Sequence, residues 1–407
     1  MPKNLLLLLA CLFIVMIGFG ITLPVLPFYA ERLHIAGSTN RQTMAVHVTL
    51  LTSIYALMQL IFSPFWGNWS DRVGRRSLVL LGLAGAAITQ LLFGLVNSLW
   101  MLYAVRALGG FLTSAMLPAA TAYVADITTK SDRNRGMAWL GSAVSLGVVA
   151  GAALGGLATR PELHFAIRYQ HFRIDGFSLP FFAAAVLAGI TLLIALRWLP
   201  ESLHSQLATA SRRPQVIHWL ERSNRPLLRL LALTIAGQFG LTIFEATFPL
   251  YSQETLNYGP SEIGLVFMVC GLVMAVFQAI AVSYFSKYMS AIFQVALGFG
   301  LMGIGIALLL IMRTSPMVLG AVGLLALGMA FVSPNLTALI ANRGGEHTGA
   351  VLGMQNAANS LGQVGGPLLG GLLFAWQADA PYLIAGVFLA SLGLAIGFAN
   401  PPSSIIQ

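Results

Sequence analysis

Apolar runs of about twenty residues, separated by short polar stretches, recur along the whole chain. A run of that length matches a helix that spans the hydrocarbon layer of a bilayer. Twelve runs can be marked, near residues 5–30, 46–66, 78–97, 99–125, 137–158, 178–199, 227–252, 261–285, 291–312, 316–341, 349–376 and 380–399. Only 9% of the residues are charged, against about a quarter in a soluble globular domain. The pattern predicts an all-α integral membrane protein and excludes an ordinary soluble enzyme.

Orientation follows from the 22 Lys and Arg residues, which outnumber the 13 Asp and Glu residues. Fifteen of them fall on one side of the alternating spans and six on the other, and only Arg106 falls inside a span. Because cytoplasmic loops carry the excess of Lys and Arg, both termini are expected in the cytoplasm. The basic residues lack interleaved stacking aromatics, so nucleic-acid binding is not favoured. Cys11 and Cys270 lie inside apolar runs, and neither a disulfide framework nor a metal site is predicted.

The longest polar stretch, residues 201–226, divides the spans into two sets of six. We therefore expect an N-terminal six-helix bundle over residues 1–200, a cytoplasmic linker over 201–226 and a C-terminal six-helix bundle over 227–407. A glycine pattern repeats across this border at a constant offset of 215 residues: Gly147, Gly151, Gly155 and Gly156 recur as Gly362, Gly366, Gly370 and Gly371. Glycines four residues apart share a helical face that another helix can approach closely. Static packing is one interpretation, whereas a duplicated unit also explains the recurrence, and such repeats are a transporter architecture.

A glycine-rich and charged string follows the second span. Its members are Gly67, Asp71, Arg72, Gly74, Arg75 and Arg76. Glycines permit sharp backbone geometry, so the string is interpreted as a tight cytoplasmic turn. As a whole, it resembles the loop signature of the major facilitator superfamily.

Other stretches carry the same resemblance. Residues 102–126, with Arg106 inside the span, are similar to the fourth-span pattern of that family, and residues 198–201 to the end of its sixth span. The run from Gly147 to Gly156 resembles the antiporter motif of the drug:proton antiporter branch, which contains the multidrug and tetracycline exporters. The motif normally has a proline after its central glycine; here that residue is Ala152, and the proline occurs in the second copy, as Pro367.

The resemblance implies a fold of twelve helices in two bundles and a charged gate. Asp71, Arg75 and Asp126 are implied to form a cytoplasmic cluster that holds the outward-facing state against the eleventh span. An acid is favoured near the N-terminus of a helix, which supports such a contact. A contact that forms in one state and breaks in the other is what alternating access needs.

Glu245 is the one acid placed well inside a span, because the other twelve divide equally between the two membrane sides. A charged acid at mid-membrane costs about 2.5 to 3.5 kcal/mol on insertion scales, so such residues are paired, protonated or functional. We therefore predict proton coupling through Glu245, with Asp126 and Arg106 as further candidates. The alternative is that Glu245 lies nearer the outer surface or is hydrogen-bonded to a neighbouring helix.

Polar side chains on apolar spans mark a candidate substrate cavity. They are Tyr55 and Gln59 in the second span, Gln238 with the neighbouring Phe244 in the seventh, Met274 and Gln278 in the eighth, and Gln355, Asn359 and Gln363 in the eleventh. Residues four apart share a helical face. Amides and aromatics with few fixed charges suit a neutral or cationic amphipathic substrate, whereas each polar residue alone could instead bond a neighbouring helix.

The expected function is secondary active transport that exports small amphipathic compounds or drugs in exchange for protons. No cofactor is expected beyond the proton gradient, and the protein is expected to act as a monomer in the inner membrane. An exporter of one endogenous metabolite, siderophore or sugar, or a proton symporter, remains an alternative. No catalytic or phosphate-loop motif occurs, which disfavours an enzyme or an ATP-driven pump. His164 and His171 fall in the loop of residues 159–176, which is expected to be solvated rather than metal-binding.

Overall fold

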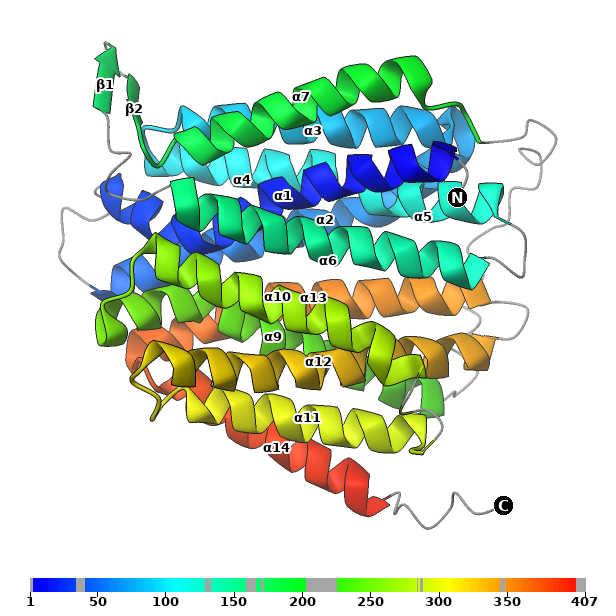
Figure 1. Cartoon of the computed structure of the whole chain (residues 1–407), viewed down its shortest axis with the longest axis vertical. Helices are drawn as coiled ribbons and strands as arrows, with labels where there is room; N and C mark the ends of the chain where they lie inside the picture. Colours follow the sequence, from blue (N-terminus) through cyan, green and yellow to red (C-terminus); the bar gives the residue numbers. More distant parts are fainter. Residues whose placement is uncertain are drawn as a thin grey trace. The chain divides into compact units, whose positions relative to one another are not determined.

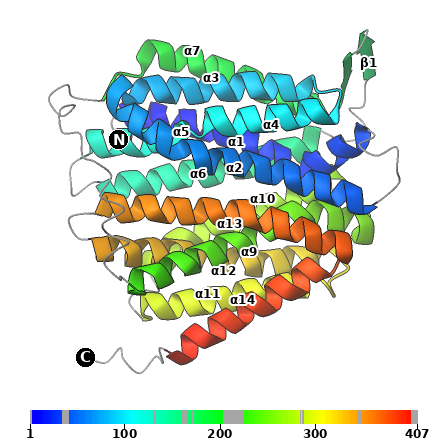
Figure 2. The same ribbon diagram turned by 180° about the vertical axis from the view of Figure 1, so that it is seen from behind.

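The computed structural model describes residues 3–33, 41–128, 133–158, 166–169, 172–202, 225–283, 285, 288–344 and 348–399. The helices of the first half are α1 (Lys3–Arg32), α2 (Arg41–Val73), α3 (Arg75–Gly94), α4 (Leu99–Thr113), α5 (Met116–Ile127), α6 (Arg133–Ala158) and α7 (Leu179–Trp198). Those of the second half are α9 (Arg225–Leu256), α10 (Pro260–Ser283), α11 (Ala291–Leu308), α12 (Ser315–Gly344), α13 (Thr348–Trp376) and α14 (Ala380–Ala399). Figure 1 and, from behind, Figure 2 show these helices.

Among the described residues, 11 helical stretches are long and apolar enough to cross a membrane, with α4 and α5 counted as one. The long helix α13 is not among them, because its glycines and amides lower its mean hydropathy. The expectation of an all-α membrane fold is confirmed. The structure adds one small sheet.

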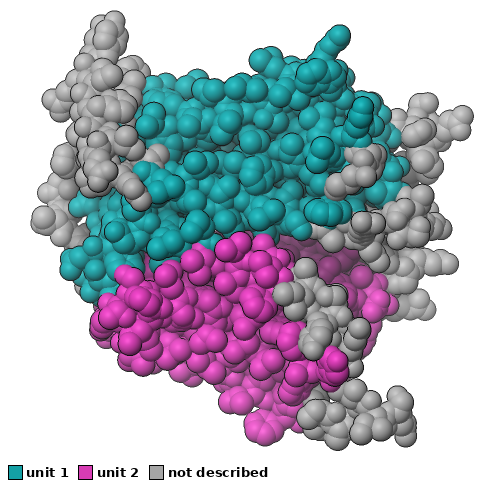
Figure 3. Space-filling view, in the orientation of Figure 1, with its two compact units in different colours: residues 1–210, 252–268 teal, residues 211–251, 269–407 magenta. Residues whose placement is uncertain are grey.

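Two compact units make up the chain (Figure 3). Unit 1 contains residues 1–210 and 252–268, and unit 2 contains residues 211–251 and 269–407. In unit 1 the core is formed by buried side chains such as Leu8 of α1, Leu83 of α3 and Tyr123 of α5. In unit 2, Phe299 of α11 and Leu325 of α12 are fully buried. Most of the linker expected at 201–226 lies outside the described residues, so the domain limits remain a prediction.

The helix α2 is longer than its apolar run and ends only at Val73. Gly67, Asp71 and Arg72 are therefore helical, and the expectation that the whole string forms a turn is wrong. The turn is confined to Gly74, whose φ of 100° favours glycine. The reason is that no residue between 67 and 73 breaks the helix, whose polar end continues beyond the apolar part of the span.

The fourth span is divided into α4 and α5 at Ser114 and Ala115. The Thr113 hydroxyl donates a hydrogen bond to the Gly109 carbonyl oxygen (2.7 Å), and the Ser114 hydroxyl donates to that of Phe111 (2.7 Å). Side-chain bonds of this type to preceding carbonyls often bend helices. They account for the break between two otherwise continuous apolar segments.

An antiparallel hairpin lies between α6 and α7, formed by β1 (Ala166–Tyr169) and β2 (Phe172–Asp175). Ile167 is opposite Ile174 in its register. The loop predicted for residues 159–176 is thus partly a two-stranded sheet, because a hydrogen-bonded hairpin satisfies backbone groups that a loop leaves to water. His164 and His171 lie outside the described residues.

Three glycines of α6, Gly147, Gly151 and Gly155, form a close-packed seam with α1 in unit 1. A Cβ atom added at Gly147 would lie 2.6 Å from the Phe13 carbonyl oxygen, and one at Gly155 would lie 2.8 Å from that of Ile21. One at Gly151 would meet the Ile17 carbonyl oxygen and lie 2.9 Å from the Gly20 Cα atom. Without side chains, the two backbones can approach this closely.

Gly156, also in α6, faces a different neighbour from the three glycines of this seam. A Cβ atom added there would lie 3.0 Å from the Cα atom of Gly264, at the start of α10 and within unit 1. The Ser261 hydroxyl also donates a hydrogen bond to the Gly156 carbonyl oxygen (2.8 Å). The two glycines therefore mark a second close helix contact.

The equivalent seam in unit 2 joins α13 to α9. Cβ atoms added at Gly362 and Gly366 would each lie 2.9 Å from a carbonyl oxygen of α9, and one at Gly370 would lie 3.1 Å from the Thr247 Cγ2 atom. The Thr242 hydroxyl donates a hydrogen bond to the Gly362 carbonyl oxygen (3.1 Å). The repeated glycines thus join the first and fifth spans of each half. Pro367 lies in α13 next to this seam, and α13 continues through it as a single helix.

Candidate functional site

Arg106 lies inside unit 1, in the middle of α4, with 6% of its surface exposed. Its Nε atom donates a hydrogen bond to the Leu51 carbonyl oxygen of α2 (2.9 Å), and its guanidinium carbon lies 4.7 Å from the centre of the Tyr55 ring. The ring face offers a favourable electrostatic contact to a buried cation. The Tyr55 hydroxyl pairs with that of Thr113 (2.9 Å), and the Gln59 amide donates to Tyr55 (3.4 Å). Three predicted residues are therefore brought together here.

A small cavity adjoins this group. Its polar lining residues come from α1, α2, α3 and α4, and they are Thr22, Tyr55, Thr89, Gln90, Arg106 and Thr113. Among the described residues, the buried Gln90 Oε1 atom has no hydrogen-bond partner. Gln90 was not predicted as a cavity residue, although it is a polar side chain on an apolar span, which is the signal that predicted the other cavity residues. Together these groups can bind a polar part of a ligand or ordered water.

Glu245 lies in unit 2, within α9, and is half-buried. Among the described residues, no ion pair reaches it. It is close enough to Cys270 of α10 for an electrostatic interaction. The position inside α9 agrees with the sequence analysis, and its coupling role remains a prediction. Arg106 belongs to unit 1.

The cavity candidates of unit 2 have different environments. Gln238 packs against the glycine seam, since a Cβ atom at Gly362 would lie 2.8 Å from its Cβ atom. Phe244 is fully buried and contacts Phe248 with 5.0 Å between ring centres. Gln355 is buried and donates a hydrogen bond to the Thr337 hydroxyl of α12 (2.8 Å), which supports the packing interpretation. The remaining candidates are half-buried: Met274, Gln278, Asn359 and Gln363.

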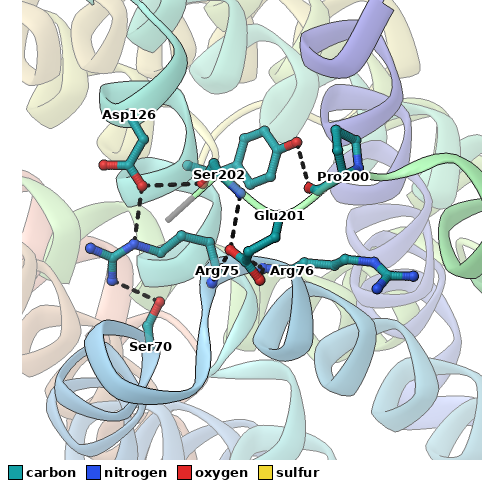
Figure 4. A network of polar contacts seen from close by, with 8 residues as sticks. Ser70, Arg75, Arg76, Asp126, Pro200, Glu201 and Ser202 are labelled. Carbon is teal, nitrogen blue, oxygen red and sulfur yellow. Dashed lines mark hydrogen bonds and ion pairs between the residues drawn. The ribbon is translucent and has the colours of Figure 1, made fainter. Parts of the chain in front are cut away.

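The cytoplasmic end of unit 1 carries a polar network (Figure 4). The Arg75 Nε atom forms an ion pair with Asp126 Oδ2 (3.3 Å), and its Nη1 atom donates to the Ser70 hydroxyl (3.0 Å). Arg76 reaches the other way and donates through Nη2 to the Leu196 carbonyl oxygen of α7 (2.6 Å). Arg72 is exposed. A Cβ atom added at Gly67 would lie 3.8 Å from the Pro118 Cβ atom, which is ordinary van der Waals contact. Asp71 lies in the last turn of α2, and its side chain is outside the part that the structure describes.

Glu201 completes this network and was not predicted as a site residue. Its Oε1 atom accepts hydrogen bonds from the Arg75 backbone N–H (2.9 Å) and the Ser202 backbone N–H (3.0 Å). The Ser202 hydroxyl donates to Asp126 Oδ2 (3.1 Å), the atom that Arg75 also contacts. The segment that directly follows α7 is therefore part of the charged cluster.

Known proteins resemble the chain over nearly its full length. Residues 8–364 match the family model described as Major Facilitator Superfamily. The chain is 32% identical over 398 residues to "Multidrug resistance protein 2" of Bacillus subtilis (strain 168), covering 95% of this chain and 93% of that protein. It is 25% identical over 398 residues to "Quinolone resistance protein NorA" of Staphylococcus aureus (strain N315), covering 96% and 95%.

A solved structure has the same fold. The human organic anion transporter MFSD10 (TETRAN) superposes with a TM-score of 0.69 at 22% identity, covering 97% of this chain and 100% of that one. Similarity at this identity shows the fold alone.

The chain is therefore a multi-pass membrane transporter and not an enzyme. It belongs to the major facilitator superfamily, and its full-length relatives include multidrug resistance proteins. The resemblance inferred from the motifs is confirmed.

Proposed function

We propose that the chain exports small amphipathic compounds in exchange for protons, by alternating access, as a monomer in the cytoplasmic membrane of a bacterium. The observation that carries this proposal is Glu245, an acid half-buried within the membrane-spanning helix α9. An ionisable group at that depth is a functional candidate by default, because its charged form is costly there. The names of the full-length relatives, which describe multidrug and quinolone resistance, support export of drug-like compounds.

In this mechanism Glu245 takes up and releases the proton. Arg106 supplies a fixed positive charge in unit 1, and its contacts to Leu51 and Tyr55 hold it beside the cavity. Arg106 keeps its charge, whereas Glu245 loses its negative charge when it binds a proton, so the net charge of the membrane-spanning helices depends on the protonation of Glu245. The cytoplasmic cluster of Arg75 and Asp126 is proposed as the gate.

Purified protein in proteoliposomes with an imposed pH gradient tests this function. We expect the gradient to accelerate transport of lipophilic cations and neutral amphipathic drugs, and Glu245→Gln to abolish that acceleration. Glu262→Gln, which makes the same change at the outer end of α10, is the matched control, and Asp71→Asn is the gate-defective control. Transport that ignores the gradient would indicate a facilitator. Transport of a single compound from a broad panel would indicate a dedicated metabolite exporter.

A further inference from the structure

The chain that leaves α7 is fastened to the gate motif by a series of polar contacts, all within unit 1 (Figure 4). The contacts are Arg76 Nη2 to the Leu196 carbonyl oxygen (2.6 Å), the Tyr123 hydroxyl to the Pro200 carbonyl oxygen (2.9 Å), the Arg75 N–H to Glu201 Oε1 (2.9 Å) and the Ser202 hydroxyl to Asp126 Oδ2 (3.1 Å). We call residues 196–202 the clasp segment. It ends where the connection to the second repeat begins.

Glu201 replaces a missing cap at the start of α3. The first helical residues of any helix leave backbone N–H groups without partners, and a side chain at the preceding position usually accepts from them. That position is Gly74, which has no side chain. Glu201 Oε1 accepts from the Arg75 N–H (2.9 Å), and Oε2 accepts from the Arg76 N–H (3.3 Å). A carboxylate at a helix N-terminus also gains from the helix dipole.

The glycine of the motif is explained by the same carboxylate. A Cβ atom added at Gly74 would meet Glu201 Oε2 and would lie 2.8 Å from Glu201 Cδ. The backbone angles of Gly74, φ 100° and ψ 152°, are also nearly restricted to glycine. The absence of a side chain at Gly74 thus permits the turn and also lets the carboxylate of Glu201, 127 positions later in the chain, approach the backbone.

Arg75 connects this cap to the ion pair. Its backbone N–H is bound by Glu201, while its side chain reaches Asp126 (3.3 Å) and Ser70 (3.0 Å). Asp126 Oδ2 in turn accepts from Ser202, the residue next to Glu201. The cap, the ion pair and the clasp segment therefore form one closed set of contacts.

We propose that Glu201 is a positioning residue for the cytoplasmic gate. Its carboxylate fixes the backbone from which Arg75 reaches Asp126, and Ser202 fastens the start of the inter-repeat connection to that same aspartate. Opening of the gate is thereby coupled to release of the clasp segment. This inference rests on the gate role given to Arg75 and Asp126 under the proposed function.

Labelling of a cysteine placed within the clasp segment tests the proposal without measuring transport. The native Cys11 and Cys270 are buried, and Leu199 of the clasp segment is 2% exposed, so Leu199→Cys supplies a thiol that becomes reactive when the segment is released. We expect Glu201→Gln to raise the rate of labelling by a water-soluble maleimide at least threefold, and Ser202→Ala to raise it to a smaller extent. The matched control is Glu262→Gln, which weakens a carboxylate contact to the Gly259 N–H (3.0 Å) at the start of α10 and leaves the clasp segment intact.

Transport kinetics separate positioning from substrate binding. Glu201→Gln is expected to lower the maximal rate about tenfold while the KM changes less than twofold, because Glu201 contacts Arg75 and Arg76 at the gate and does not line the cavity beside Arg106. Equal labelling rates for Glu201→Gln and Glu262→Gln would overturn the proposal, as would a change in KM that matches the change in maximal rate. If Glu201→Gln fails to fold, Ser202→Ala decides by the same labelling criterion. Failure of gradient-driven transport in the unmodified protein would refute the proposed function, and the labelling comparison would still stand.

Discussion

The glycine seam between α1 and α6 makes a quantitative prediction about a single methyl group. In Gly151→Ala the added Cβ would meet the Ile17 carbonyl oxygen and lie 2.9 Å from the Gly20 Cα atom, so the helices must separate. Gly141 lies on the same helix, is exposed and has nothing within 4 Å of an added Cβ. Gly141→Ala is therefore a control with the same chemistry and without the collision.

The magnitude follows from two terms. Both substitutions gain the helix propensity of alanine over glycine, about 0.8–1.0 kcal/mol. Only Gly151→Ala carries the overpacking cost, about 1–3 kcal/mol. The propensity gain cancels in the comparison, so Gly151→Ala should be less stable than Gly141→Ala by about 1–3 kcal/mol. At about 2–4 °C per kcal/mol for domains of 150–250 residues, the apparent Tm should differ by roughly 2–12 °C.

The assay can use the native thiols. Cys11 and Cys270 are both buried, so a thiol-reactive dye reports unfolding of the detergent-solubilised protein during heating. An apparent Tm for Gly151→Ala within 1 °C of that for Gly141→Ala would show that the two helices accommodate the methyl group, and the seam would not be a close-packed contact.

Three further predictions concern other parts of the fold. Gly74→Ala should lower the apparent Tm because a φ of 100° is strained for alanine, at a cost of about 1–3 kcal/mol. Gly67→Ala should not lower it, because the added Cβ would lie 3.8 Å from its nearest neighbour, the Pro118 Cβ atom. Arg106→Lys should reduce transport while the protein still folds, because lysine keeps the charge but lacks the guanidinium that contacts Leu51 and stacks on a ring; full transport would refute this. Asn335→Leu should lower the apparent Tm by leaving the Gln294 Oε1 atom without its 3.0 Å partner, and changing both residues to Leu should cost less than the sum of the two single changes.

The span limits were largely predictable from the sequence, because the thickness of the hydrocarbon layer sets both the length of the apolar run and the length of the spanning helix. The last span, predicted near 380–399, is α14 over Ala380–Ala399. The error at α2 arose because hydropathy marks where a helix leaves the membrane and not where it ends. Its polar continuation to Val73 has no apolar signal.

The site was predictable only where sequence neighbours share a face. The four-residue spacing placed Tyr55 and Gln59 together, and the structure joins them by a hydrogen bond (3.4 Å). The contact between Glu201 and Arg75 joins residues 126 positions apart, and no local pattern indicates which acid will cap a distant helix. The glycine spacing likewise predicted a close approach for α6 without naming α1 as its partner.

The composition of α13 has a consequence for how the protein is made. Its glycines are needed for the seam with α9, and its amides include Gln355, which bonds to Thr337 of α12. The same residues leave α13 outside the group of helices that are apolar enough to cross a membrane by themselves. Entry of a helix into the bilayer from the translocon depends on its hydrophobicity, so α13 has a weak tendency to leave that channel alone. Its insertion during synthesis should therefore depend on α9 and α12, which precede it in the chain and offer the partners for its glycines and amides.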